Sequence, residues 1–207
     1  MPQATTQERR RSFSSFNYKD AFKYLRINEL MRWELEADPV ALSAFFQQRL
    51  ERLQRFDLDS LEVSKSLLID AICEEALEEC PRLKIWKGAS LEGEDVCGNV
   101  DYLIAERRGY LEAPFVCVIE AKKDDFEQGT AQCLVEMKAC QWVNQNMGKT
   151  IPIYGIVTNG EGWKFYRLRT TGEVDESLLS GIGDMAMLLG RSRLFFQLCQ
   201  ENLTRKT

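Results

Sequence analysis

Glu120 and Lys122 are the residues whose types and spacing first indicate chemistry. They close an apolar run from Phe115 to Lys122 that is typical of a buried strand, and residues two apart on a strand project from the same face. Asp101 lies on the preceding predicted strand, so its carboxylate and that of Glu120 can share a hard cation such as Mg²⁺. Lysine can position an attacking water and stabilise charge that develops on a phosphate. Two carboxylates, a lysine and a metal ion suffice for phosphodiester hydrolysis.

The sequence contains no histidine, which excludes mechanisms that use imidazole as a base or as a zinc ligand. Acid–base and metal chemistry must therefore use carboxylates, lysine and water. The formal net charge of -5 argues against a dedicated nucleic-acid-binding protein, which usually has a basic surface. A local basic patch, or the charge of a bound metal ion, is compatible with that acidic average.

The seven cysteines are scattered and show neither a disulfide framework nor a C-x-x-C zinc spacing, so we expect reduced and mostly buried thiols. No apolar run approaches the roughly 20 residues needed to span a bilayer. The basic residues near the N-terminus are not followed by the apolar segment of a secretory signal. We therefore expect a cytoplasmic protein.

The first 60 residues are predicted to lie outside the core. Residues 1–15 are polar and basic, which predicts a disordered tail, with a phosphate-contacting arm formed by Arg9, Arg10 and Arg11 as the alternative. Residues 16–60 are predicted to form a helical extension. Its two amphipathic helices, at 18–36 and 39–55, would provide a packing or partner surface.

Residues 61–207 are predicted to form one α/β domain with a mixed central sheet flanked by helices. The hydrophobic pattern predicts helices at 62–79, 124–146 and 184–203, and strands at 83–89, 98–105, 115–122, 152–157 and 163–168. The long helix between the third and fourth strands would join them as a parallel pair.

The helix at 62–79 has an acidic residue on its apolar face. At 100° per residue, Glu75 falls near the middle of that face. Buried acids are rare unless they are paired or bind a metal, so Glu75 is a candidate site residue. Glu74, Glu78 and Glu79 remain alternatives.

Gly98-x-x-Asp101, followed by Val118-Ile119-Glu120-Ala121-Lys122 and a long helix, resembles the PD-(D/E)-x-K nuclease superfamily of restriction endonucleases. Asn99-Val100 precedes the first acid here, where the superfamily motif has proline. The resemblance covers residues 64–169, about half of the chain. It implies a restriction-endonuclease-like core.

The resemblance also implies an activity, a Mg²⁺-dependent DNA endonuclease in which Mn²⁺ can replace Mg²⁺. It assigns Asp101 and Glu120 as metal ligands and Lys122 as the residue that positions the attacking water. Glu75, on the helix before the sheet, would assist at the metal, and Gln132, on the helix after the lysine, would support the site. The likeness to nuclease domains of type I restriction enzymes makes DNA restriction or defence the expected role.

A second hypothesis is a catalytically inactive nuclease-fold module that acts as a binding or scaffold subunit. The acidic average favours it, whereas the intact set of inward charges argues against it. DNA is the expected partner in the first hypothesis. A homodimer or a larger nuclease complex would use the apolar faces of the helices at 18–55 and 184–203. Substrate form and sequence specificity stay open.

Overall fold

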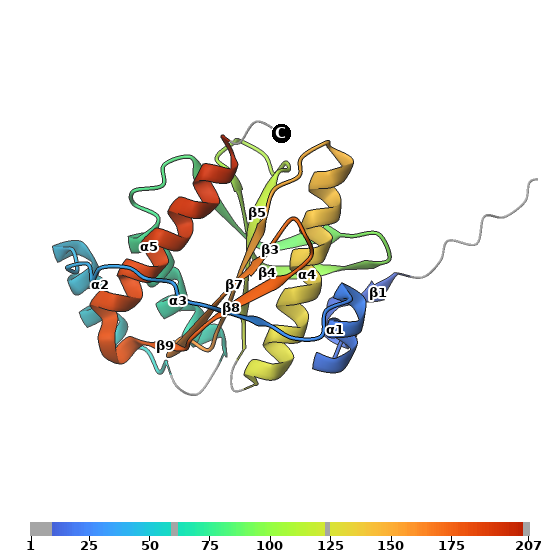
Figure 1. Ribbon diagram of the computed structural model, residues 1–207. Helices are drawn as coiled ribbons and strands as arrows, with labels where there is room; N and C mark the ends of the chain where they lie inside the picture. The colour runs from blue at the N-terminus through green and yellow to red at the C-terminus, as the bar shows by residue number, and fades with distance from the viewer. Residues whose placement is uncertain (1–9, 59–61, 123–124, 205–207) are drawn as a thin grey trace, which may run out of the picture.

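A mixed β-sheet covered by helices on both faces forms the core of the protein (Figure 1). The computed structural model describes residues 10–58, 62–122 and 125–204. The predicted α/β class, with a mixed central sheet flanked by helices, is confirmed. None of the helices in these ranges is both long and apolar enough to cross a membrane.

The elements of the described residues have the following bounds. The strands are β1 (Arg11–Ser12), β2 (Met31–Trp33), β3 (Leu83–Glu92), β4 (Val96–Glu106), β5 (Phe115–Ala121), β6 (Ile153–Thr158), β7 (Gly162–Leu168), β8 (Val174–Ser177) and β9 (Ser180–Gly181). The helices are α1 (Tyr18–Leu25), α2 (Ala44–Leu53), α3 (Glu62–Ala76), α4 (Phe126–Asn146) and α5 (Met185–Asn202), with the 3-10 turns η1 (Phe13–Ser15) and η2 (Ile182–Asp184).

The sheet has the strand order β1-β4-β5-β6-β7-β8-β2, with β3 also paired to β4 and β9 to β7. The long helix α4 joins β5 to β6, and these two strands pair in parallel, as predicted. The neighbouring pairs β4–β5 and β6–β7 are antiparallel. Asn159-Gly160 forms the tight turn between β6 and β7, where the φ angle of 89° at Gly160 favours glycine.

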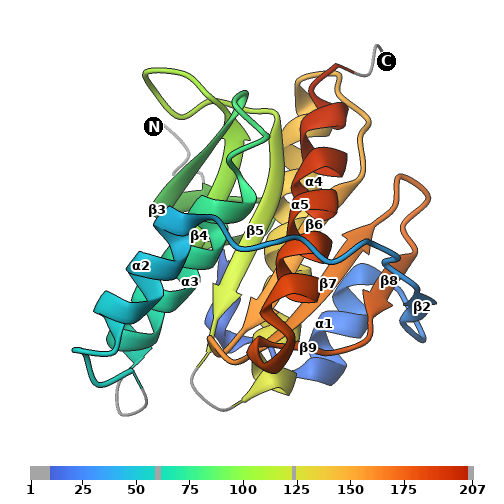
Figure 2. The same cartoon turned by 90° about the vertical axis from the view of Figure 1, so that its left-hand side faces the viewer.

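Helices α1 and α4 lie on one face of the sheet, and α3 and α5 lie on the other (Figures 1 and 2). The apolar strand β5 is buried between the two layers because its side chains alternate between them. Cys117 interacts with Cys73 of α3 and with Cys199 of α5. Lys122, which directly follows β5, contacts Gly129 of α4. Even-numbered residues of β5 and Lys122 therefore face α4.

The N-terminal tail is more ordered than the sequence predicts. Residues 11–15 form β1 and η1, and β1 pairs in parallel with β4. The predicted disorder up to residue 15 is therefore wrong for this part, while Arg9 lies outside the described residues. Arg10 forms an ion pair with Glu92 and Arg11 with Asp20, so both bind carboxylates of the protein itself.

The helical extension predicted at 16–60 belongs in part to the sheet. The predicted helix at 18–36 ends at Leu25, because Arg26 adopts the left-handed conformation with a φ angle of 59°. Met31–Trp33 then forms β2, which pairs in parallel with β8 at the far edge of the sheet. The N-terminal segment thus contributes a strand beside β4 and another beside β8. It is not a unit separate from the core.

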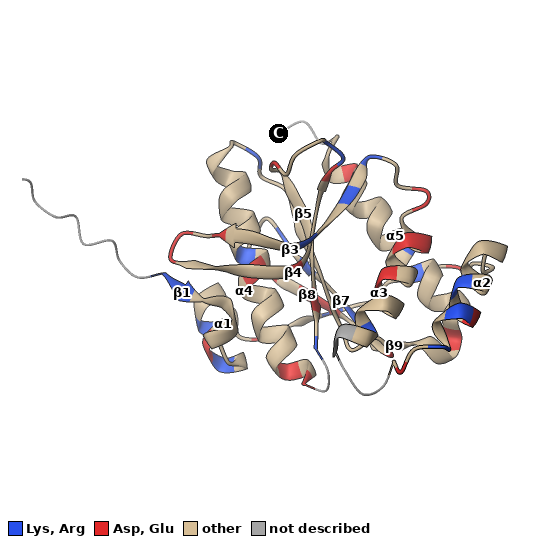
Figure 3. Ribbon diagram, turned by 180° about the vertical axis from the view of Figure 1, so that it is seen from behind, with Lys and Arg blue, Asp and Glu red and all other residues tan. Residues whose placement is uncertain are grey.

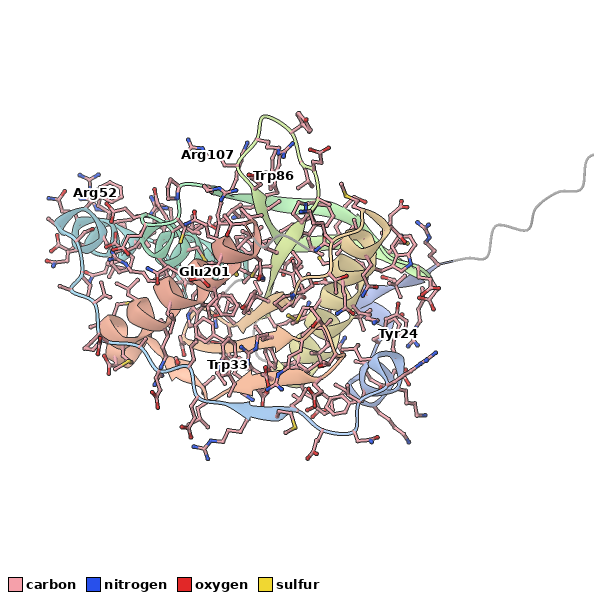
Figure 4. The ribbon with its side chains drawn as sticks, turned by 45° about the horizontal axis from the view of Figure 1, so that its top comes forward. Tyr24, Trp33, Arg52, Trp86, Arg107 and Glu201 are labelled. Carbon is pink, nitrogen blue, oxygen red and sulfur yellow. The ribbon has the colours of Figure 1, made fainter. Side chains whose placement is uncertain are left out.

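Trp33 points from β2 into a cluster with Tyr154 and Phe195 on the α5 side of the sheet (Figure 4). The guanidinium group of Arg167 lies 4.7 Å from the centroid of the Trp33 ring. Arg167 and Arg169 both form ion pairs with Asp175, whose side chain is almost fully buried. These two arginines therefore neutralise a buried carboxylate.

The apolar face of α5 packs on the sheet. Its buried residues include Leu188, Leu189, Phe195 and Phe196. The expectation that this face remains exposed for a partner is therefore wrong. Helix α2, by contrast, keeps Phe45 exposed.

Candidate active site

Asp101 of β4 and Glu120 of β5 meet across adjacent antiparallel strands. Tyr102 is paired with Ile119, and continuing this register places Asp101 opposite Glu120. The backbone N–H of Ala121 donates a hydrogen bond of 2.9 Å to Asp101 Oδ2. This bond holds the Asp101 carboxylate against the end of β5, beside Glu120.

Lys122 forms an ion pair with Glu120, with 2.6 Å between Nζ and Oε1. The Glu120 side chain has no exposed surface, whereas that of Lys122 is 27% exposed, so the site is reached from the lysine side. Burial and the nearby charge of Asp101 raise the pKa of Glu120 to about 7, and the ammonium group of Lys122 opposes that rise. The structure therefore brings Asp101, Glu120 and Lys122 together.

Helix α4 adds Gln132 and Glu136 to this group. The Gln132 amide donates a hydrogen bond of 3.0 Å to Glu136 Oε1, as residues four apart on a helix can. Burial and the charge of Glu120 raise the pKa of Glu136 well above its usual value, with Asp101 adding to the rise. Gln132 is therefore buried under α4 and hydrogen-bonded to Glu136, and Glu136 is a residue that sequence reasoning missed.

A signal for Glu136 was present in the sequence. It lies four residues after Gln132, so a helix that points Gln132 at the site must point Glu136 toward the same layer. Both side chains are buried, and Glu136 has no exposed surface.

Glu75 does not join this group. Its carboxylate accepts hydrogen bonds from the Ser43 backbone N–H at 3.1 Å and from the Ser43 hydroxyl at 2.9 Å. Arg193 Nη2 lies 3.7 Å from the same carboxylate. Glu75 thus joins α3 to the N-terminal end of α2 and to α5, on the face of the sheet opposite α4.

The position of Glu75 along α3 also separates it from the site. Lys65, near the start of α3, lies beside Gly160, in the turn that follows β6. That turn marks the site end of the sheet, because the Lys122 N–H donates to the Thr158 carbonyl. Glu75 lies ten residues further along α3, or roughly 15 Å at the rise of an α-helix. The prediction that Glu75 assists at the metal is wrong, although it is the buried glutamate of its cluster.

The start of α4 lies beside the N-terminal segment. Asp125 caps the helix by accepting a hydrogen bond from the Gln128 N–H at 2.9 Å. The Gln128 side chain donates to the Phe16 carbonyl at 3.0 Å. Gln128 therefore anchors the segment that precedes α1.

The chemistry of these side chains suits a hard divalent cation. Asp101, Glu120 and Glu136 supply carboxylate oxygens, which Mg²⁺ and Mn²⁺ prefer. Except for the ion pair with Lys122, neither oxygen of Glu120 has a hydrogen-bond partner, and Glu136 Oε2 also lacks one. In the described ranges, no three Cys, Asp or Glu side chains already stand in a ligating arrangement. Ion binding would therefore require these side chains to turn toward a common point.

Comparison with models of known protein families found no match for this chain, and comparison with curated proteins found none either.

Proposed function

We propose that the protein is a metal-dependent nuclease that hydrolyses phosphodiester bonds in DNA. The observation that carries the proposal is the meeting of Asp101, Glu120 and Lys122 at the end of two adjacent strands, with a buried carboxylate paired to a partly exposed lysine. In this proposal the mixed sheet and its two helical layers form a restriction-endonuclease-like core.

Each side chain has a distinct role in this proposal. Asp101 and Glu120 would hold Mg²⁺ or Mn²⁺, which supplies charge neutralisation at the phosphate and lowers the pKa of an attacking water. Lys122 reaches solvent, so its ammonium group can orient that water and stabilise charge that develops on the phosphate. Gln132 holds Glu136 by a hydrogen bond and thereby supports the buried side of the site.

Because the formal net charge is -5, DNA binding by this protein would have to depend on local positive charge. Lys and Arg segments alternate with Asp and Glu segments over the helices and strands in the view of Figure 3. A bound cation would add positive charge at the site, where a phosphate must approach. The seven cysteines are free thiols, which supports a reducing compartment, so we place this activity in the cytoplasm. A role in DNA restriction or defence is part of the same proposal.

The experiment is cleavage of supercoiled plasmid with Mg²⁺ or Mn²⁺, comparing the wild type with Asp101→Asn and Lys122→Met. We expect both variants to lose at least about 100-fold in rate, the scale of removing one electrostatic catalytic group. Lys164→Met is the matched control, because Lys164 is also a strand lysine in an ion pair with a glutamate, at 2.8 Å from Glu176. It should cleave at the wild-type rate.

The alternative is a nuclease fold that binds without cutting. The complete burial of Glu120 favours it, because a phosphate-bound cation must reach that carboxylate. Under this alternative the wild type and Lys122→Met retain the same DNA affinity in gel-shift assays and neither cleaves. Cleavage that depends on both Asp101 and Lys122 would refute it. A homodimer or larger complex as the working form remains a further proposal, checked by light scattering with and without DNA.

A further inference from the structure

A group of buried oxygen atoms between β5 and α4 has few donors. Three atoms without a hydrogen-bond partner among the described residues belong to it, namely Oε2 of Glu120, Oε2 of Glu136 and Oε1 of Gln132, and the only partner there of Glu120 Oε1 is the ammonium group of Lys122. Glu120 and Glu136 have no exposed surface and Gln132 is 6% exposed. Buried polar atoms are nearly always satisfied, so such a group indicates something that binds oxygen from outside the chain.

The backbone allows α4 to approach the sheet closely at this place. A Cβ atom at Gly129 would lie 2.8 Å from Val157 Cγ1 and 3.0 Å from Lys122 Cγ. A Cβ atom at Gly155 of β6 would lie 2.5 Å from Met137 Sδ. Because larger residues would hold the helix away, these glycines bring the helical carboxylate of Glu136 next to those of the strands.

The charges of the group define the ion that fits. Asp101, Glu120 and Glu136 each affect the pKa of another member, so their carboxyl groups interact. The ammonium group of Lys122 offsets one of the three negative charges when all are ionised. Two negative charges then remain in a buried site, where ionised carboxylates require a counter-charge. A divalent cation balances them.

We propose that Glu136 is a further ligand of the metal ion held by Asp101 and Glu120, positioned for this by its hydrogen bond from Gln132. The inference rests on the proposed function and adds to it a carboxylate from the helical layer. An ion bound there would be held by carboxylates of β4, β5 and α4, the type of ligand that Mg²⁺ and Mn²⁺ prefer. With the cation neutralising Glu120, the Lys122 ammonium group would be able to turn from Glu120 toward a phosphate.

The test measures Mn²⁺ binding by calorimetry with the wild type, Glu136→Gln and Glu75→Gln. Glu75→Gln is the matched control, because Glu75 is also a buried helical glutamate but lies on the opposite face of the sheet. We expect Glu136→Gln to weaken Mn²⁺ binding at least tenfold and Glu75→Gln to leave it unchanged. Glu136→Asp, which keeps the charge on a shorter side chain, should lose less affinity than Glu136→Gln.

Thermal unfolding supplies a second readout. Mn²⁺ that binds the folded state should raise the melting temperature of the wild type and of Glu75→Gln, and it should raise that of Glu136→Gln much less. Wild-type Mn²⁺ affinity in Glu136→Gln would overturn this inference and leave the proposed function standing. If the wild type binds no Mn²⁺, both the inference and the proposed metal site fail.

Discussion

Replacing Glu120 with glutamine should change how stability depends on pH. The pKa of Glu120 is raised from 4.5 to about 7, mainly by burial and then by the charge of Asp101. The folded state therefore binds this proton more tightly than the unfolded state does. Below about pH 4.5 this titration does not change the free energy of unfolding. The free energy of unfolding falls as the pH rises from about 4.5 toward about 7, and above about pH 7 the whole contribution of this group has been lost.

The size of the effect follows from the interval between the two pKa values, 4.5 and about 7. At about 1.4 kcal/mol per unit of pKa difference, the interval corresponds to about 3 kcal/mol, of which about 2–3 kcal/mol develops between about pH 5 and about pH 8. Glu120→Gln removes this titration. The substitution also removes the repulsion between the carboxylates of Glu120 and Glu136, which further favours the variant as the pH rises.

The assay is urea unfolding in EDTA at a series of pH values, with the free energy of unfolding extrapolated to water. The free energy of unfolding of Glu120→Gln minus that of the wild type should increase by about 2–3 kcal/mol from about pH 5 to about pH 8. Glu78→Gln is the control, since the Glu78 side chain is 68% exposed and should show no such shift. A difference that is the same at both pH values would refute the reasoning.

Two further changes test a buried ion pair on the α5 side of the sheet and the packing of α4 on its other side. Asp175→Asn should lower the free energy of unfolding by about 3 kcal/mol, because it breaks a buried carboxylate's ion pairs with two arginines; thermal melts at neutral pH measure this. Gly155→Ala should destabilise by about 1–3 kcal/mol, because the added methyl group would overlap Met137 Sδ and Cys133 Sγ. Gly109→Ala meets no atom within 4 Å and serves as its control, so equal melting temperatures for the two variants would contradict the packing argument.

Local patterns in the sequence were enough to predict much of the core. The side chains of a strand alternate with a period of two, so Glu120 and Lys122 had to share a face, and they form an ion pair there. The apolar run around them predicted a central buried strand, and the structure confirms one with helices on both faces. These features depend on neighbours in the chain, which the sequence displays directly.

Short strands at the sheet edges could not be predicted in this way. The apolar spacing of Leu30 and Trp33 suited a helix, yet Met31–Trp33 pairs with β8. A three-residue strand has too few residues to show a period, and its hydrogen bonds go to a segment far along the chain. Pairing of this kind is decided by the tertiary structure.

The sequence by itself determined which side chains face inward, and the tertiary structure decided which layer they meet. Glu75 was correctly predicted to face the core, but α3 covers the side of the sheet away from Lys122, and Ser43 binds its carboxylate. Glu136 comes from α4, whose close approach to the sheet places it beside Glu120. Helical periodicity gives the angle of a side chain about its own axis, whereas the side of the sheet on which a helix packs depends on contacts between distant segments.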